Sequence, residues 1–272
     1  MRLLDAKAVQ INKTVRFKEF FDVDTPPYAI LSHTWGQDEV TFHGLRSGLG
    51  EGTEGLKKIK ECCAQAVVDG YAWVWIDTCC IDKSSSAELS EAINSMFKWY
   101  SNSAVCYAYL ADVPSMRLES ISAAPFLKTE PFGRSRWFSR AWTLQELIAP
   151  RKLEFYSRDW GLIGSKDRML RELSEITTIH QDALMGDLRK FSVAQKLSWA
   201  SKRQATRSED TAYCLLGILG VNMPLLYGEG ERAFIRLQEA FLSISDDQSL
   251  FAWQNLGPGI LHNIGYTGWT TY

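Results

Sequence analysis

A carboxylate and a large aromatic side chain lie four residues apart in this chain, at Trp142 and Glu146. They belong to Ser139–Pro150, which we predict to be a helix because Ser139 can cap its first turn and Pro150 cannot continue it. Residues four apart meet on a helix surface, so we expect the indole and the carboxylate to stack together. A carboxylate held in this way could act on a ligand. The same spacing also fits a helix with one core face and a solvated Glu146, and the spacing alone leaves both interpretations open.

Two predicted strands end in polar side chains. Each is a short apolar run, Tyr28–Ser32 and Tyr71–Ile76, and polar or aromatic residues follow directly. In an open α/β sheet, ligands bind at the carboxyl ends of the strands. A strand followed by a loop with a packed Trp and a capping Asp is the structural alternative. The candidate ligand-contacting residues at these two ends are Ser32, His33, Trp35 and Asp77.

Three arginines, Arg134, Arg136 and Arg140, are interleaved with aromatic residues directly before the predicted helix. The first turn of a helix carries free N–H groups and the positive end of the helix dipole. Arg136 and Arg140 would therefore suit a ligand that carries phosphate groups. A solvated basic turn is the alternative.

The order of the predicted elements favours a parallel sheet with helices on both faces. Three strands alternate with two amphipathic helices, a pattern that right-handed crossovers join into one sheet. The apolar alternation of Lys152–Ser157 predicts a further strand. The first three strands are Tyr28–Ser32, Tyr71–Ile76 and Ala104–Leu110, and the helices between them are Leu56–Val67 and Leu89–Tyr100.

The pattern of the chain becomes helical from about residue 165. Three segments beyond that point carry apolar residues at helical spacing. We therefore predict an α/β core over residues 1–164 and a helical extension over residues 165–272, packed on the core as one compact unit. Residues 111–133 lack periodicity and predict a surface loop. The three helical segments are Ser192–Lys202, Ser208–Leu219 and Glu229–Ser245.

The composition excludes several classes of partner. The net charge of −2 and the isoelectric point near 6.1 give no overall attraction to nucleic acid or to anionic lipid. No apolar run approaches the roughly 18 residues that span a bilayer, and the start of the chain lacks the apolar core of a signal peptide. We expect a cytoplasmic protein that neither spans a membrane nor binds nucleic acid.

The cysteines and histidines do not predict a metal site. The six cysteines include two adjacent pairs inside apolar stretches, and neither pair has the CxxC spacing of a zinc site. The four histidines are scattered, without HExxH or another paired spacing. We expect reduced thiols in the core and no bound metal.

Three blocks of the chain resemble the fungal heterokaryon-incompatibility (HET) domain. They are Tyr28–Gly36, Trp75–Asp82 and Ser139–Leu147, and the resemblance continues in order over most of the chain. Proteins of this family trigger programmed cell death when incompatible fungi fuse. In many of them the domain is the N-terminal effector of a longer receptor with a nucleotide-binding module and repeats. The resemblance therefore implies C-terminal receptor domains beyond Tyr272, self-association on activation, and a part in fungal immunity.

A more distant resemblance is to Toll/interleukin-receptor (TIR) domains, which implies a flavodoxin-like, parallel-sheet core. Ile30–His33 is similar to the Ser-rich end of the first TIR strand, and Trp142–Leu147 is similar to the WCLxEL helix of plant examples, with Thr143 where Cys is usual. TIR enzymes depend on the Glu of that motif when they cleave NAD at the nicotinamide bond. By matched position, this catalytic role falls to Glu146. The long helical region of this chain departs from the TIR pattern.

The resemblance implies that NAD, or a related nucleotide, is a substrate and that no cofactor is needed. Nicotinamide leaves as a neutral molecule, so the barrier lies in the oxocarbenium-like ribose, whose positive charge Glu146 would stabilise. The other candidates would bind the rest of the substrate. They are Ser32 and Asp77 for hydroxyl groups, with His33 beside them, Trp35 or Trp142 for a flat ring, and Arg136 or Arg140 for the pyrophosphate.

The alternative is a non-enzymatic module that signals cell death through protein interaction and oligomerisation, with the same motifs serving only the fold. Convergence of Ser32, Asp77 and Glu146 on one open cleft would favour the enzyme. Dispersal or burial of these side chains would favour the module.

Overall fold

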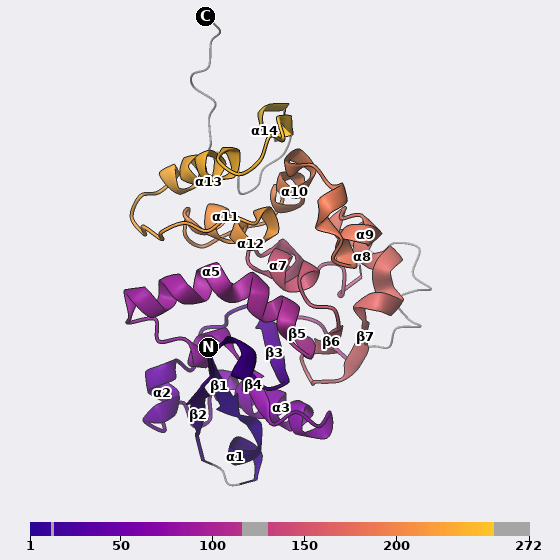
Figure 1. The fold of residues 1–272 in the computed structure, drawn as a ribbon. Coiled ribbons are helices and arrows are strands. Elements are labelled where there is room, and N and C mark those ends of the chain that lie inside the picture. The colour runs from indigo at the N-terminus through magenta and orange to yellow at the C-terminus, as the bar shows by residue number, and fades with distance from the viewer. Residues whose placement is uncertain (12–13, 116–129, 253–272) are drawn as a thin grey trace, which may run out of the picture.

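The computed structural model describes residues 1–11, 14–115 and 130–252, and within them the centre is a seven-stranded sheet (Figure 1). Its order is β2-β1-β4-β3-β5-β6-β7. The four strands β4-β3-β5-β6 run parallel, whereas the outer strands pair antiparallel. The strands are β1 (Arg2–Asp5), β2 (Phe17–Glu19), β3 (Tyr28–His33), β4 (Trp73–Trp75), β5 (Val105–Leu110), β6 (Leu153–Ser157) and β7 (Leu162–Ser165).

The parallel strands follow the flavodoxin-like order. The chain forms β3, crosses to β4 on one side and then to β5 on the other, before β6 extends the sheet. In sheets of this order, ligands bind outside the carboxyl ends of the strands where the order reverses, here between β3 and β5. Ser32 and His33 end β3 at that place. The predicted α/β class is confirmed, while the likeness to TIR domains stays a prediction.

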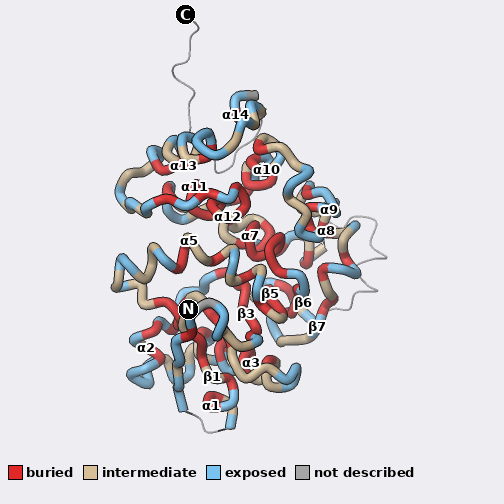
Figure 2. Tube along the Cα trace, viewed as in Figure 1, coloured by how far each residue is buried: buried red, intermediate tan, exposed pale blue. Residues whose placement is uncertain are grey.

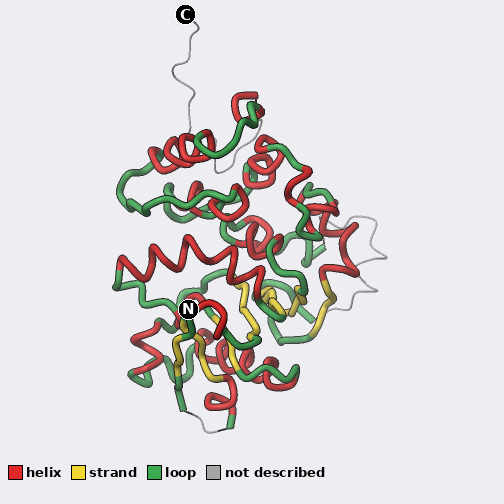
Figure 3. The backbone as a smooth tube through the Cα atoms, in the orientation of Figure 1, coloured by secondary structure: helices red, strands yellow, loops and turns green. Residues whose placement is uncertain are grey.

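Helices cover both faces of the sheet (Figures 1 and 3). On one face, Tyr107 of β5 donates a hydrogen bond to Asp69, directly after α3, at 2.6 Å. On the other face, Trp75 of β4 packs edge-on against Tyr100 of α5. Side chains alternate along a strand, and the register of Trp75 with Ile30 therefore turns Ser32 towards the α5 face. The helices are α1 (Ala6–Gln10) and α3 (Glu54–Val68) on the first face, and α5 (Ser86–Asn102) and α7 (Thr143–Ile148) on the second.

The two crossover helices predicted from apolar spacing are confirmed. Each begins slightly earlier than predicted, because a hydroxyl side chain caps its first turn. Thr53 accepts from the backbone N–H of Leu56 at 3.2 Å, and Ser85 accepts from that of Glu88 at 3.3 Å. Two short helices complete this part of the chain: α2 (Phe42–Arg46) and α4 (Asp77–Cys80).

The prediction of one helix over Ser139–Pro150 is wrong at its start. A 3-10 turn, η3 (Arg136–Ser139), precedes the helix, and α7 begins only at Thr143. The reason is tertiary: Ser139 O and Ala141 N pair with the backbone of Gln204 at 2.6 and 2.8 Å. Because these backbone groups bond Gln204, residues 139–141 do not form the first turn of the helix, and Ser139 is not the cap of α7. The predicted end is confirmed, since α7 stops before Pro150.

The C-terminal part consists of short helices, as expected, although Ser208–Leu219 divides into α11 and α12. Gly217 of α12 lies so close to α5 that an added Cβ would be 2.0 Å from Phe97 Cβ. A single cluster of buried side chains continues from the sheet into these helices, although the division at residue 164 stays a prediction (Figure 2). The helices are α8 (Leu170–Thr177), α9 (Gln181–Leu184), α10 (Val193–Ala200), α11 (Asp210–Tyr213), α12 (Leu216–Leu219), α13 (Arg232–Leu242) and α14 (Ser249–Ala252).

All six cysteines are buried and free, as predicted for core thiols. The predicted surface loop, residues 111–133, lies largely outside the described residues, but Phe132 is fully buried and contacts Phe138 and Phe155. Among the described residues, no helix is both long enough and apolar enough to cross a membrane.

Candidate active site

Glu146 lies against the carboxyl end of β3. The helix that carries it, α7, contacts β3 on the α5 face of the sheet. Ser32 Oγ donates a hydrogen bond to Glu146 Oε2, and it accepts one from Trp137 Nε1 at 2.8 Å. Ser32 is fully buried and Glu146 is 5% exposed. Two sequence-predicted residues, 114 positions apart in the chain, therefore meet directly.

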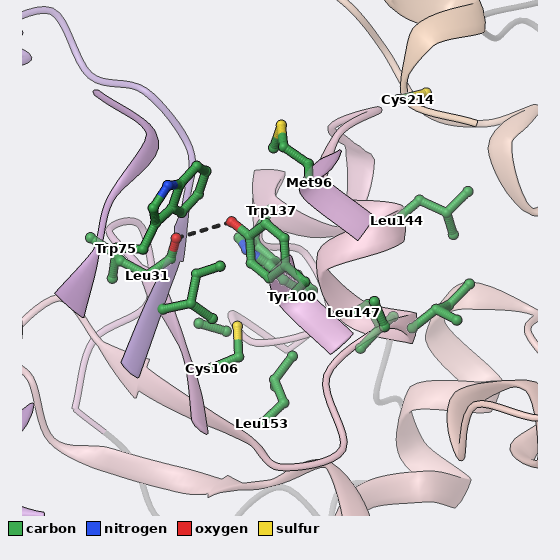
Figure 4. Packing of buried hydrophobic residues seen from close by; sticks show 14 of the residues in the cluster. Leu31, Trp75, Met96, Tyr100, Cys106, Trp137, Leu144, Leu147, Leu153 and Cys214 are labelled. Atoms are coloured by element: carbon green, nitrogen blue, oxygen red, sulfur yellow. Dashed lines mark hydrogen bonds between the residues drawn. The ribbon is translucent and has the colours of Figure 1, made fainter. Parts of the chain in front are cut away.

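Tyr100 completes the surroundings of this carboxyl group. Its hydroxyl donates to the carbonyl oxygen of Leu31 at 3.1 Å, the bond drawn in Figure 4, and it lies close enough to Glu146 to influence the pKa of that carboxyl group. The ring of Tyr100 is buried in the apolar cluster between the sheet and α7. The sequence predicted Tyr100 only as part of the apolar stripe of its helix, because spacing does not show where a phenolic hydroxyl points.

Burial is the main influence on the pKa of Glu146 and raises it to about 8. The negative charge of Asp77 acts in the same direction, whereas the hydrogen bond from Ser32, the nearby Tyr100 hydroxyl group and the positive charge of Arg203 act against it, and the value of about 8 is the net result. At pH 7 this carboxyl group is mostly protonated. A cation brought close to it would favour the ionised form.

Arg203 is a buried cation near the start of α7 that was not predicted from the sequence. Its Nη1 donates to Arg140 O at 3.0 Å and to Thr143 Oγ1 at 2.9 Å, directly before and at the start of α7. Burial lowers the pKa of Arg203 to about 10. Since Arg203 lies beyond a predicted helix end, only the tertiary structure brings it to Glu146.

His33 lies between two carboxylates at the outer side of this site. Its Nδ1 is 3.8 Å from Asp77 Oδ1, and its Nε2 is 3.6 Å from Glu39 Oε2. Lys58 Nζ lies 2.5 Å from the other oxygen of Glu39. Burial raises the pKa of Glu39, but the neighbouring His33, the charge of Lys58 and the N–H group of Gly36 together hold it well below its usual range. Glu39 and Lys58 were not predicted as site residues.

Trp35 and Asp77 form the exposed part of the site. Trp35 Nε1 donates to Asp77 Oδ2 at 2.8 Å, and half of the Trp35 surface is exposed. Lys83 Nζ lies 3.4 Å from the centre of the Trp35 ring and 3.7 Å from Asp77 Oδ2. The residues predicted at the ends of β3 and β4 therefore come together.

The three remaining predicted residues have other partners. Trp142 precedes the first turn of α7, and its side chain hydrogen-bonds Asp210, whereas Glu146 bonds Ser32, so stacking of the two side chains stays a prediction. Arg140 donates to Thr206 Oγ1 at 3.2 and 3.3 Å. The polar groups of both side chains thus bond residues of the C-terminal part of the chain.

Arg136 is exposed, and its backbone N–H donates to Asp112 Oδ2 at 2.8 Å. A role for Arg136 or Arg140 in binding pyrophosphate stays a prediction. Within the described ranges, no group of three His, Cys, Asp or Glu side chains could hold a metal ion.

The site has a closed inner part and an open outer part. Ser32 and Glu146 are buried, whereas the Asp77 side chain is 20% exposed. The influence of Asp77 on the pKa of Glu146 links the two parts. A cavity of about 690 Å³ is lined by Tyr28 and Ala104, at the amino ends of β3 and β5. It therefore lies at the opposite end of the parallel strands from Glu146.

Most of the chain is similar in sequence to a known protein. The family model described as "Heterokaryon incompatibility protein (HET)" matches residues 28–126. The chain is 47% identical over 244 residues to a curated protein of Podospora anserina, "Vegetative incompatibility protein HET-E-1". The match covers 88% of this chain but spans only 18% of that relative's length. No solved structure matches the chain.

Proposed function

The chain carries a heterokaryon-incompatibility (HET) domain, and we propose that it is the effector part of a fungal incompatibility protein that causes cell death by cleaving NAD. The relative's name describes vegetative incompatibility, and this chain corresponds to a small part of that protein. Receptor domains that control the effector, and self-association on activation, are part of the same proposal. We place the reaction at Glu146, in the site described above.

One observation carries the enzymatic part of the proposal. A carboxyl group, Glu146, lies at the carboxyl end of β3, next to the reversal of strand order where ligands of such sheets bind. A buried carboxyl group with a strongly shifted pKa beside further polar groups is typical of catalytic sites. A purely structural helix would gain more from an apolar residue there, because burying a carboxyl group costs free energy.

The reaction requires a negative charge next to the ribose. As the bond between C1′ of the ribose and the pyridinium nitrogen breaks, its electron pair moves to the nitrogen and nicotinamide leaves as a neutral molecule. The ribose then carries positive charge, which the Glu146 carboxylate stabilises. A water oxygen bonds to C1′ and releases its proton to solvent, which gives ADP-ribose.

The raised pKa of Glu146 is compatible with these reaction steps once the charge of the substrate is included. The free protein holds the group mostly neutral at pH 7. The oxidised nicotinamide ring brings a positive charge, which favours the carboxylate. Ser32 then acts as a positioning residue, since its hydroxyl group is already shared between Glu146 and Trp137.

The burial of Ser32 and Glu146 favours the second candidate, an interaction module without turnover. For the enzyme, the inner part has to open to the ribose. Expression of the wild type and of Glu146→Gln in fungal cells distinguishes the two, with Glu175→Gln on the exposed side of α8 as a control. The enzyme predicts that Glu146→Gln loses toxicity and spares cellular NAD, while Glu175→Gln keeps both effects.

Retained toxicity of Glu146→Gln without NAD depletion would support the module and contradict the enzyme. The neutral Gln keeps the size and hydrogen-bonding capacity of protonated Glu146, so partner binding should survive it. Equal protein levels of the variants have to be confirmed in the same cells.

A further inference from the structure

We propose that the ring face of Trp35 and the carboxylate of Asp77 form a binding site for a cationic heteroaromatic ring, which the side chain of Lys83 occupies in the free protein. The identity of the ring rests on the proposed function: it is the positively charged nicotinamide ring of oxidised NAD. The site would therefore select the charged form of the substrate, and Lys83 would compete with it.

The contacts of Lys83 show what this site holds. Its ammonium group lies 3.4 Å from the centre of the Trp35 ring and 3.7 Å from Asp77 Oδ2. A cation within about 6 Å of an indole face is attracted by the negative face of the ring. A carboxylate at the same position adds a full opposite charge. Burial lowers the pKa of the Lys83 ammonium group, and the charge of Asp77 opposes that effect, so the carboxylate and the indole face are the groups that attract a cation here.

The site is ordered by its own contacts. Trp35 Nε1 donates to Asp77 Oδ2 at 2.8 Å, so the carboxylate that faces the cation also fixes the orientation of the indole. Asp77 is held from its other side by His33, whose Nδ1 lies 3.8 Å from Oδ1. A ligand would meet a preformed site, which lowers the entropy lost on binding.

Lys83 can leave this position. Its side chain is 30% exposed and lies in the turn between α4 and α5, on a flexible four-carbon stem. Half of the surface of Trp35 is exposed. A planar ring could therefore replace the ammonium group on the indole face without rearranging the sheet.

The charge of the site decides which ring it accepts. Asp77 repels an anionic group, and a neutral nicotinamide or a reduced dihydropyridine ring gains nothing from the carboxylate. Ser32, which bonds Glu146, and His33, which lies 3.8 Å from Asp77, are consecutive residues at the end of β3, so a cation at Asp77 would act on the same end of this strand as the reacting carboxyl group. The group that recognises the charged ring would then lie close to the bond that is broken.

The test uses 1-methylnicotinamide, a nicotinamide cation without a ribose, so that binding is measured without any turnover. Isothermal titration compares it with neutral nicotinamide on the same protein. The wild type should bind the cation more tightly. Trp35→Leu and Asp77→Asn should each weaken cation binding about fivefold or more, as expected for the loss of a cation–aromatic or charge contact. Trp35→Phe should keep part of the affinity.

Lys83→Gln should strengthen binding of 1-methylnicotinamide several-fold, because the competing ammonium group is gone. Lys57→Gln, at an exposed surface pair with Glu54, is the matched control and should change nothing. Equal affinity for the cation and for neutral nicotinamide, or weaker cation binding by Lys83→Gln, would overturn the inference. Cation binding without NAD cleavage would overturn the proposed reaction instead, and cleavage without cation preference would overturn only the inference.

Discussion

At the scale of single residues, Glu146 is subject to two opposing influences. Burial raises its pKa, while the hydrogen bond from Ser32 and the nearby Tyr100 hydroxyl group lower it, and the net value is about 8. The protonated form is therefore stable in the free protein, and the carboxylate forms most readily beside a positive charge. The balance has consequences that can be measured without any substrate.

The first prediction concerns the pH dependence of stability. The pKa of Glu146 rises from an ordinary value of 4.5 to about 8 on folding, so the folded protein binds more protons than the unfolded chain in this window. The free energy of unfolding should therefore fall as pH rises from 4.5 to about 8, by at most about 1.4 kcal/mol per pH unit. Urea unfolding at a series of pH values, for the wild type and Glu146→Gln, measures this.

The prediction concerns the difference in the free energy of unfolding between the wild type and Glu146→Gln, because the other groups titrate in both proteins and cancel in the difference. Glu146→Gln should become more stable than the wild type as pH rises towards 8 and above. A constant difference across the whole range would mean that Glu146 has an ordinary pKa in the folded protein. Glu175→Gln, at an exposed pair with Arg171, should follow the wild type.

The second prediction concerns Ser32, whose hydroxyl group donates to Glu146. Because that bond lowers the pKa of Glu146, Ser32→Ala should raise it further. A titration of the labelled Glu146 carboxyl carbon by NMR measures the shift. Ser198→Ala, on an exposed face of α10, should leave the titration unchanged. A lower pKa in Ser32→Ala would show that Ser32 does not bond the ionised form.

At the scale of elements, the position of Glu146 depends on α7, a short helix held at both ends by distant residues. Arg203 donates to Arg140 O and Thr143 Oγ1 at its start. Lys166, which is 2% exposed, donates to the carbonyl oxygens of Leu147, Ile148 and Pro150 at its end. These cations replace the capping side chains that a longer helix would have in its own sequence.

The third prediction tests this support. Lys166→Met should lower the free energy of unfolding by about 1–3 kcal/mol, because three buried carbonyl oxygens lose their donor. The midpoint of urea unfolding measures the loss. Lys57→Met removes an exposed lysine and should stay within about 0.5 kcal/mol of the wild type. An unchanged midpoint for Lys166→Met would show that the end of α7 needs no such support.

The sequence predicted α7 only in part, for a physical reason. Pro150 ends it as expected, because proline cannot continue a helix. Its start depends on Gln204, which pairs with Ser139 and Ala141 from more than 60 residues away. Local spacing carries no information on such a partner.

At the scale of the whole molecule, the parallel strands were predictable because each is a short apolar run bounded by turns. The antiparallel strands β1, β2 and β7 were not, since strands of only three or four residues are too short to show an apolar pattern. The contacts of Asp77 with His33 and Trp35 followed from the rule that the carboxyl ends of parallel strands share one edge. Arg203, Glu39 and Lys83 could not be predicted, because charged residues in loops and helix ends are usually solvated.

The fourth prediction concerns the contact between the sheet layer and the C-terminal helices. Gly217 of α12 packs directly on Phe97 of α5, and a methyl group there would overlap the Phe97 side chain. Gly217→Ala should therefore force α12 away from α5 and destabilise the whole protein by about 1–3 kcal/mol in one cooperative transition. Thermal unfolding followed by both circular dichroism and tryptophan fluorescence measures it. Two separate transitions would show that the regions fold independently.

The most direct test of the central claim is the rate of nicotinamide release from NAD by the purified protein at high concentration, measured for the wild type and for Glu146→Gln. Loss of the carboxylate removes the stabilisation of the ribose cation, so the rate should fall by at least about a hundredfold while the fold is retained. Glu175→Gln should release nicotinamide at the wild-type rate. An equal rate in Glu146→Gln, or no release by the wild type, would contradict the assignment of Glu146 as the catalytic group.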